Sequence, residues 1–162
     1  MKRNIITLLI TVFAMLQATA QTYDNLWKQA DIIAQKDQPK SEIGVMKKII
    51  SKATAAKDYG QLLAAEIRQA ILWREISPDS LTPNVKRMET EALKAKDPVL
   101  KAVRYAVLGK VYREVNGKKS EEFFKKAMEQ PELLARNTST GYVPLTLKGV
   151  DGSSFNNDLL HL

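Results

Sequence analysis

The chain of 162 residues contains no cysteine and only one histidine, His161. Without cysteine it has no disulfide bond, no thiolate nucleophile, no cysteine-ligated metal and no cysteine for a lipoprotein anchor. One histidine cannot supply the usual ligand set of a transition metal. The sequence also lacks a glycine-rich phosphate loop and a His-Glu metalloprotease motif. We therefore expect no metal and no cofactor.

The remaining reactive groups give little support to an enzyme. Asp151, Gly152 and Ser153 resemble part of many catalytic loops, but a serine nucleophile needs a base within hydrogen-bonding distance. His161 lies one residue from the end, where chains fray, and is a poor base for this serine. We interpret the Asp-Gly-Ser segment as a turn and predict a non-enzymatic protein, with a small hydrolase as the weakest alternative.

Basic residues outnumber acidic ones without forming a basic patch. The chain has 25 Lys and Arg against 18 Asp and Glu, which gives a formal net charge of +7. Lysine pairs such as Lys47-Lys48 and Lys125-Lys126 are interleaved with glutamates rather than massed. This pattern is typical of a solvated helical surface, so we expect no nucleic-acid partner.

The first 20 residues have the organisation of a secretory signal peptide. The basic segment Met1–Asn4 precedes the apolar run Ile5–Leu16, which is too short to span a bilayer comfortably. Small residues at Ala18 and Ala20, before Gln21, suit a signal peptidase. Removal of this segment would leave an exported protein of the periplasm or cell envelope with no stable membrane span. An N-terminal membrane anchor is the alternative.

Apolar residues then recur at spacings of three and four, which is typical of amphipathic helices. The pattern predicts about six helices, beginning near residues 23, 41, 59, 83, 98 and 120. The expected start signals are a cap at Ser41 after the break at Pro39, Thr82 before Pro83, and Asp97 before Pro98. Short links imply antiparallel neighbours that stack as hairpins, an all-α fold. Gly44 is expected at a close helix contact, and a compact bundle is the rival arrangement.

The stretch 102–135 carries the clearest repeat motif. Its residues are Tyr105, Leu108, Gly109 and Tyr112 on one helical face, then Ser120, Phe124, Ala127 and Pro131. This layout resembles a tetratricopeptide hairpin, with Gly109 small enough to admit a neighbouring helix and Ser120 where alanine is usual. We expect Asn116-Gly117 to end the first helix in the left-handed conformation and Ser120 to cap the second.

The candidate binding residues lie on the first helix of this hairpin. In a tetratricopeptide-like unit that helix lines a groove, and the motif turns Lys110 and Arg113 toward it. Two cations there would hold a peptide carboxylate. The alternative is that both side chains are simply solvated. Trp27 and Trp73 fall on apolar helical faces, where core packing is favoured over ligand stacking.

The last part of the chain differs in character from the helical region. Residues 137–141 are polar, Tyr142–Leu147 is predicted as a short strand interrupted by Pro144, and 149–152 as a turn. We divide the chain into the signal peptide 1–20, a helical-hairpin domain 21–136 and a tail or linker 137–162. The linker would lead into a following domain.

Three stretches together suggest a family: Tyr23–Lys28, Glu75–Leu81 and Phe155–His161. They resemble the N-terminal region of large alpha-2-macroglobulin-like proteins of Bacteroidetes. The resemblance implies a secreted envelope protein in which a helical region precedes many β-sandwich domains, in a family associated with trapping proteases. This chain has no cysteine for a thioester and too few residues for those domains, so no functional residue is carried over.

Two functions follow from these observations. The first is a non-enzymatic helical N-terminal module of an alpha-2-macroglobulin-like envelope protein, with a docking or spacer role, present as a fragment or a truncated gene product. The second is a free-standing periplasmic tetratricopeptide-like adaptor that binds an extended peptide. In either case the expected partner is a protein or peptide, or the downstream domains of the same polypeptide.

Overall fold

The computed structural model describes residues 22–113, 116–138, 140–145 and 159. The helices in these ranges are α2 (Tyr23–Ala34), α3 (Pro39–Ala56), α4 (Tyr59–Ile76), α5 (Pro78–Lys94), α6 (Pro98–Tyr112), α7 (Gly117–Ala127), α8 (Pro131–Ala135) and the 3-10 helix η1 (Thr140–Leu145). No β-strand occurs among the described residues, so the predicted all-α fold is confirmed.

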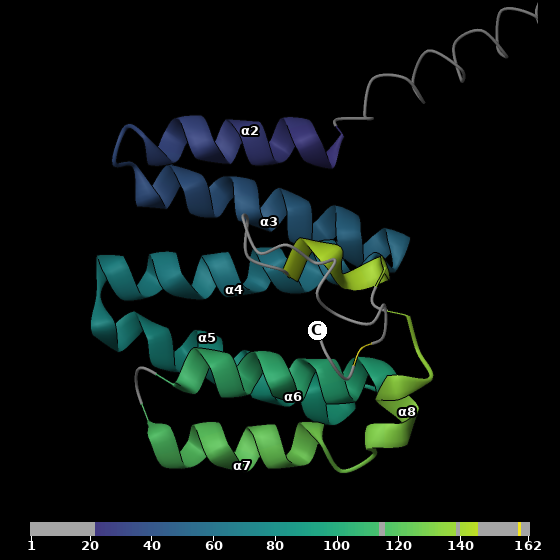
Figure 1. The fold of residues 1–162 in the computed structure, drawn as a ribbon. Helices are drawn as coiled ribbons and strands as arrows, with labels where there is room; N and C mark the ends of the chain where they lie inside the picture. The colour runs from purple at the N-terminus through teal and green to yellow at the C-terminus, as the bar shows by residue number, and fades with distance from the viewer. Residues whose placement is uncertain (1–21, 114–115, 139, 146–158, 160–162) are drawn as a thin grey trace, which may run out of the picture.

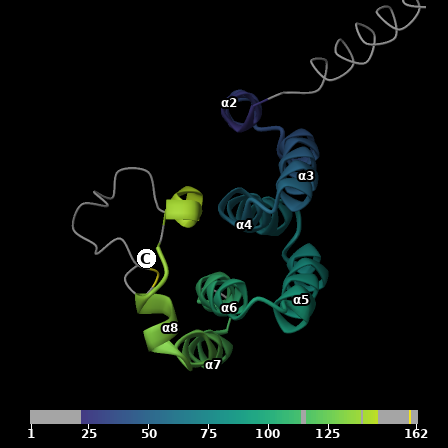
Figure 2. The same cartoon turned by 90° about the vertical axis from the view of Figure 1, so that its right-hand side faces the viewer.

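Successive helices run antiparallel and stack as hairpins (Figure 1). Viewed from the side, α2, α4 and α6 lie along one edge and α3 and α5 along the other, with α7 below α6 (Figure 2). The short η1 lies against α4 on the side away from α3 and α5 (Figures 1 and 2). We refer to this side of α4 and α6 as the inner face.

Side-chain caps explain where several helices begin. The carboxylate of Asp97 accepts from the amides of Val99 and Leu100 at 2.8 and 3.0 Å, which confirms the predicted start of α6. Asp58 likewise accepts from the amide of Gln61 at 3.2 Å at the start of α4. These contacts satisfy amide groups that have no partner within the helix.

Two helices begin earlier than predicted, each at a proline. The start of α3 is Pro39 rather than Ser41, and the start of α5 is Pro78 rather than Pro83. Proline fits the first turn of a helix because the amides there have no intrahelical partner to lose. Pro83 lies inside α5, where its missing amide removes one backbone hydrogen bond near the beginning of the helix.

The link between α6 and α7 also differs from its prediction. Asn116 is the N-cap of α7, with extended backbone (φ −155°) and a side chain that accepts from the amide of Lys119 at 3.1 Å. It is therefore not a left-handed C-cap of α6. Ser120, expected as the cap, is buried within α7. An Asn side chain satisfies an N-cap as well as a serine does, so the helix begins at the earlier candidate.

The predicted strand at Tyr142–Leu147 is wrong for the part that is described. Residues Thr140–Leu145 form η1, and a proline at Pro144 suits a short helical turn better than a strand ladder. The amide of Leu159 donates to the carbonyls of Leu134 and Asn137 at 3.2 and 2.9 Å. Both η1 and Leu159, which belong to the predicted tail 137–162, therefore pack on the helical array. The role of this segment as a linker stays a prediction.

The core consists of two clusters that share α4. One joins α2 and α3 to Ala65 and Leu72, and the other joins Leu63 and Ala70 to α5, α6, α7, α8 and η1. Trp27 and Trp73 pack against the first cluster, as expected for core residues. Because α4 is covered on two sides, the hairpins form one continuous array, as stacked helical repeats do.

Candidate functional site

A small pocket opens on the inner face between the carboxyl-terminal halves of α4 and α6. Its volume is about 210 Å³, and its lining residues are Ile67, Ala70, Ile71 and Arg74 from α4 with Lys110, Val111 and Arg113 from the end of α6. No residue of α5 lines it, which is consistent with its lying on the side away from that helix. We call it the cationic pocket, because three of its seven lining residues are Lys or Arg.

Helical spacing brings these residues together. Ile67, Ile71 and Arg74 are separated by four and three residues along α4, so they share one face. Lys110 and Arg113 are three apart at the end of α6. The structure therefore places both predicted groove residues on one wall of a pocket and adds Arg74. Arg74 lies three residues after Ile71, which belongs to the apolar face of the third predicted helix. Continuing that face by one turn would have identified Arg74 from the sequence.

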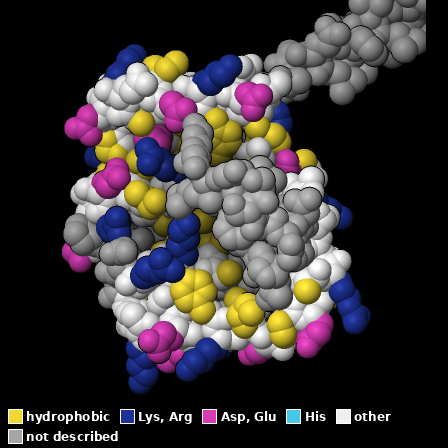
Figure 3. Space-filling model, in the orientation of Figure 1, with side chains coloured by type: hydrophobic (Ala, Val, Ile, Leu, Met, Phe, Trp, Pro, Cys, Tyr) yellow, Lys and Arg dark blue, Asp and Glu magenta, His cyan; other side chains and the backbone are white. Residues whose placement is uncertain are grey.

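The charges of the pocket are not neutralised within the described part of the chain. No carboxylate there forms an ion pair with Arg74, Lys110 or Arg113. Lys110 and Arg113 are exposed, and the guanidinium of Arg113 lies 5.8 Å from the centre of the Phe124 ring. Lys and Arg side chains gather over apolar atoms on this face (Figure 3). A carboxylate placed here would accept charge-assisted hydrogen bonds from up to three cations.

The size and lining of the pocket limit what it can bind. Pockets for drug-sized ligands or cofactors usually measure about 300–1,000 Å³, which is larger than this one. Isoleucine and valine side chains contribute an apolar lining. The arrangement therefore suits one or two residues of a peptide, with a carboxylate at the cations and an apolar group beside it.

A second polar cluster joins α5, α6 and α7. The phenol of Tyr112 donates to Glu89 Oε1 at 2.6 Å, and Lys119 donates to both at 3.0 and 3.2 Å. Burial and the hydrogen bond to Glu89 raise the pKa of Tyr112. This cluster ties the three helices together.

Buried charges inside the array were not predicted from the sequence. The carboxylate of Glu66, which is 2% exposed, accepts from Arg104 at 3.0 Å and from Arg87 at 3.2 Å. Glu42, equally buried, accepts from Arg68 at 2.6 Å. Each carboxylate is paired, as burial of a charge requires. These pairs join α3 to α4 and α4 to α5 and α6, and they offer no free group for chemistry.

The other predicted site residues lie outside the described ranges: Ala18, Ala20, Gln21, Asp151, Ser153 and His161. Within the described ranges, no group of three or more His, Cys, Asp or Glu could hold a metal ion. The helices of the same ranges include none with the length and apolar character needed to cross a membrane. Comparison with family models, with curated proteins and with solved structures found no match to this chain.

Proposed function

We propose that this chain is a non-enzymatic docking module that binds an acidic, extended segment of a protein partner in the cationic pocket. One observation carries the proposal: Arg74, Lys110 and Arg113 converge on an apolar pocket and have no carboxylate partner among the described residues. A protein that used these cations only for its own stability would be expected to pair some of them. The partner supplies the missing carboxylates.

The magnitude of binding follows from the kind of contact. A hydrogen bond to a charged group contributes about 1.5–3 kcal/mol, and ordering a flexible peptide offsets part of this gain. We expect a dissociation constant of about 10–100 μM for a short acidic peptide, which corresponds to about 5–7 kcal/mol. Salt weakens such an interaction because the cations are exposed.

The setting of the module is part of the same proposal. The predicted signal peptide and the resemblance to alpha-2-macroglobulin-like proteins support an exported envelope protein in which the helical region docks a partner or spaces the following domains. A free-standing periplasmic adaptor is the second candidate. The pocket between two helices of a hairpin array supports this candidate as much as it supports the first. The reading frame downstream of Leu162 distinguishes them, because only the first candidate requires β-rich domains there.

The pocket hypothesis is tested from the ligand side. A fluorescently labelled peptide with several glutamates, an isoleucine and a free carboxyl terminus is titrated with the chain lacking residues 1–20, and anisotropy is measured. The matched control has glutamine for each glutamate and an amidated end. We expect saturable binding of the acidic peptide and at least tenfold weaker binding of the control. Equal affinity for both peptides, or no binding of either, would contradict the proposal.

A further inference from the structure

The inner face of α4 already holds a segment of this chain. The backbone of η1 passes so close to Gly60 that a Cβ atom at Gly60 would overlap the carbonyl oxygen of Gly141. The same atom would lie 3.0 Å from Pro144 Cδ and 3.1 Å from Tyr142 Cα. Only glycine permits such an approach without displacing the neighbour. Gly60 therefore forms a seat for a peptide backbone.

Side chains rather than hydrogen bonds hold η1 in this seat. Tyr142 is 9% exposed and belongs to the same core cluster as Leu63, and Leu145 packs against that cluster. Among the described residues, no hydrogen bond joins Thr140–Leu145 to α4 or α6. A segment held by a few apolar contacts is released at lower cost than a helix of the array.

The seat and the cationic pocket lie on one stripe of α4. Gly60, Ile67, Ile71 and Arg74 follow at intervals of seven, four and three residues, so all four share a helical face. At 1.5 Å per residue, the distance along the helix from Gly60 to Arg74 is about 21 Å. An extended peptide covers that distance with about seven residues. A single peptide can therefore reach both places.

We propose that the groove between α4 and α6 is longer than the open pocket, and that η1 is a built-in occupant which a partner peptide displaces. This inference rests on the proposed function, and it specifies the partner further. Beyond the acidic end that enters the cationic pocket, the partner carries an aromatic residue and a proline, as η1 does at Tyr142 and Pro144. The tethered η1 competes at a high effective concentration, so the free chain presents only part of its site.

The test uses the chain lacking residues 1–20 and three substitutions. Tyr142→Ser removes the apolar anchor of η1 and leaves α4 intact. Gly60→Ala places a methyl group in the seat and blocks any backbone there. Gly44→Ala is the matched control, because Gly44 is an exposed helical glycine with no atom within 4 Å of an added Cβ.

Two kinds of probe separate the short site from the long one. The short probe is a peptide of four glutamates. The long probes carry the sequence Thr-Gly-Tyr-Val-Pro-Leu of η1 with two glutamates at either the amino or the carboxyl end. For Tyr142→Ser we expect about tenfold tighter binding of at least one long probe and unchanged binding of the short one. For Gly60→Ala we expect no such gain, and for Gly44→Ala wild-type behaviour.

Amide hydrogen exchange gives a readout that needs no ligand. In both Tyr142→Ser and Gly60→Ala, exchange at 140–145 should accelerate by at least tenfold while the amides of α4 and α6 stay protected. If η1 exchanges only together with the helices, or if the long probes bind the wild type but none binds Tyr142→Ser more tightly, the inference is overturned. If no probe binds any variant but η1 is released alone, the displaceable occupant stands and the acidic-peptide function fails.

Discussion

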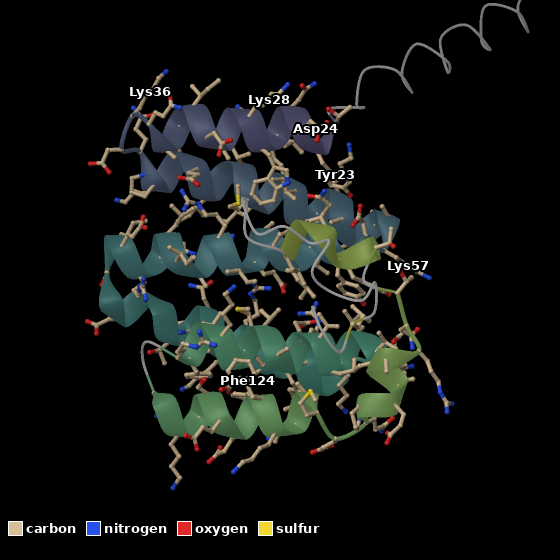
Figure 4. All side chains as sticks on the ribbon, viewed as in Figure 1. Tyr23, Asp24, Lys28, Lys36, Lys57 and Phe124 are labelled. Carbon is tan, nitrogen blue, oxygen red and sulfur yellow. The ribbon has the colours of Figure 1, made fainter. Side chains whose placement is uncertain are left out.

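The ring of Phe124 lies directly against Gly109, where a Cβ atom would be only 2.8 Å from Phe124 Cδ1. The side chain occupies the space between α6 and α7 (Figure 4). This contact confirms the prediction that a small residue at Gly109 admits a neighbouring helix. By contrast, Gly44, expected at a similar contact, is exposed and has no such neighbour.

Replacing the two helical glycines by alanine should therefore have opposite effects. Gly109→Ala forces the Phe124 ring to move, and we expect a loss of about 1–3 kcal/mol in the free energy of unfolding. Gly44→Ala should stabilise the protein by about 0.5–1 kcal/mol, because alanine favours the helix and meets no neighbour. Chemical denaturation monitored by circular dichroism checks both. Stabilisation by Gly109→Ala would show that the close contact between α6 and α7 is absent.

Ser120 explains one departure from the tetratricopeptide pattern. Its hydroxyl donates to the carbonyl of Gly109 at 2.7 Å, while the amide of Arg113 donates to Lys110 instead of Gly109. The last carbonyls of a helix have no amide of the next turn as a partner, and the serine hydroxyl satisfies this one. We expect Ser120→Ala to cost about 1–2 kcal/mol in the free energy of unfolding, measured by chemical denaturation. Threonine should retain more stability than alanine, and equal stability of alanine and wild type would contradict this role.

The two arginines that bind Glu66 should differ in importance. The side chain of Arg104 is 8% exposed and that of Arg87 is 42% exposed. Arg104→Met leaves a buried carboxylate with one fewer partner, and we expect a loss of about 3 kcal/mol in the free energy of unfolding. Arg87→Met should cost less than about 1 kcal/mol, because solvent screens the exposed Arg87 guanidinium and Glu66 keeps its buried partner Arg104. Equal losses, measured by urea denaturation, would show that burial does not set the strength of these pairs.

The sequence predicted well the features that depend on local spacing. Helical periodicity, the cap at Asp97, the small Gly109 and the shared side of Lys110 and Arg113 follow from intervals of a few residues. The pairing of Glu66 with Arg104, 38 residues apart, depends on which helical faces meet. The same is true of η1 against Gly60. Competing start signals also misplaced the beginnings of three helices. In α3 and α5 a proline at the first turn and a cap a few residues later look equally good, and in α7 Asn116 and Ser120 both suit an N-cap.

Alkaline pH should release η1. Burial, with smaller effects of Asp97 and Tyr59, raises the pKa of Tyr142 to about 12. The unfolded tyrosine loses its proton near pH 10, so between about pH 10 and 12 the folded state binds more protons and its stability falls as the pH rises. The whole contribution of Tyr142 to stability is present below about pH 10 and is lost by about pH 12.

The measurement is the ultraviolet absorbance of tyrosinate during a pH titration. One of the five tyrosines should titrate about two units later than a free tyrosine, and Tyr142→Phe should remove that step. A titration in which Tyr142→Phe removes only an ordinary step near pH 10 would mean that this side chain is not buried as described.

The most direct test of the docking function removes the three cations of the pocket without changing the net charge relative to a control. The variant is Arg74→Gln with Lys110→Gln and Arg113→Gln. The control is Lys28→Gln with Lys36→Gln and Lys48→Gln. All three control lysines are exposed, and Lys28 on α2 and Lys36 in the turn after it lie away from the pocket (Figure 4).

Affinity for the acidic peptide is measured for both triple variants by fluorescence anisotropy at physiological salt. We expect the pocket variant to lose at least about thirtyfold, which corresponds to about 2 kcal/mol, and the control to stay within about twofold of wild type. Equal losses in the two variants would mean that the peptide responds only to overall charge, and unchanged affinity of the pocket variant would mean that the partner binds elsewhere.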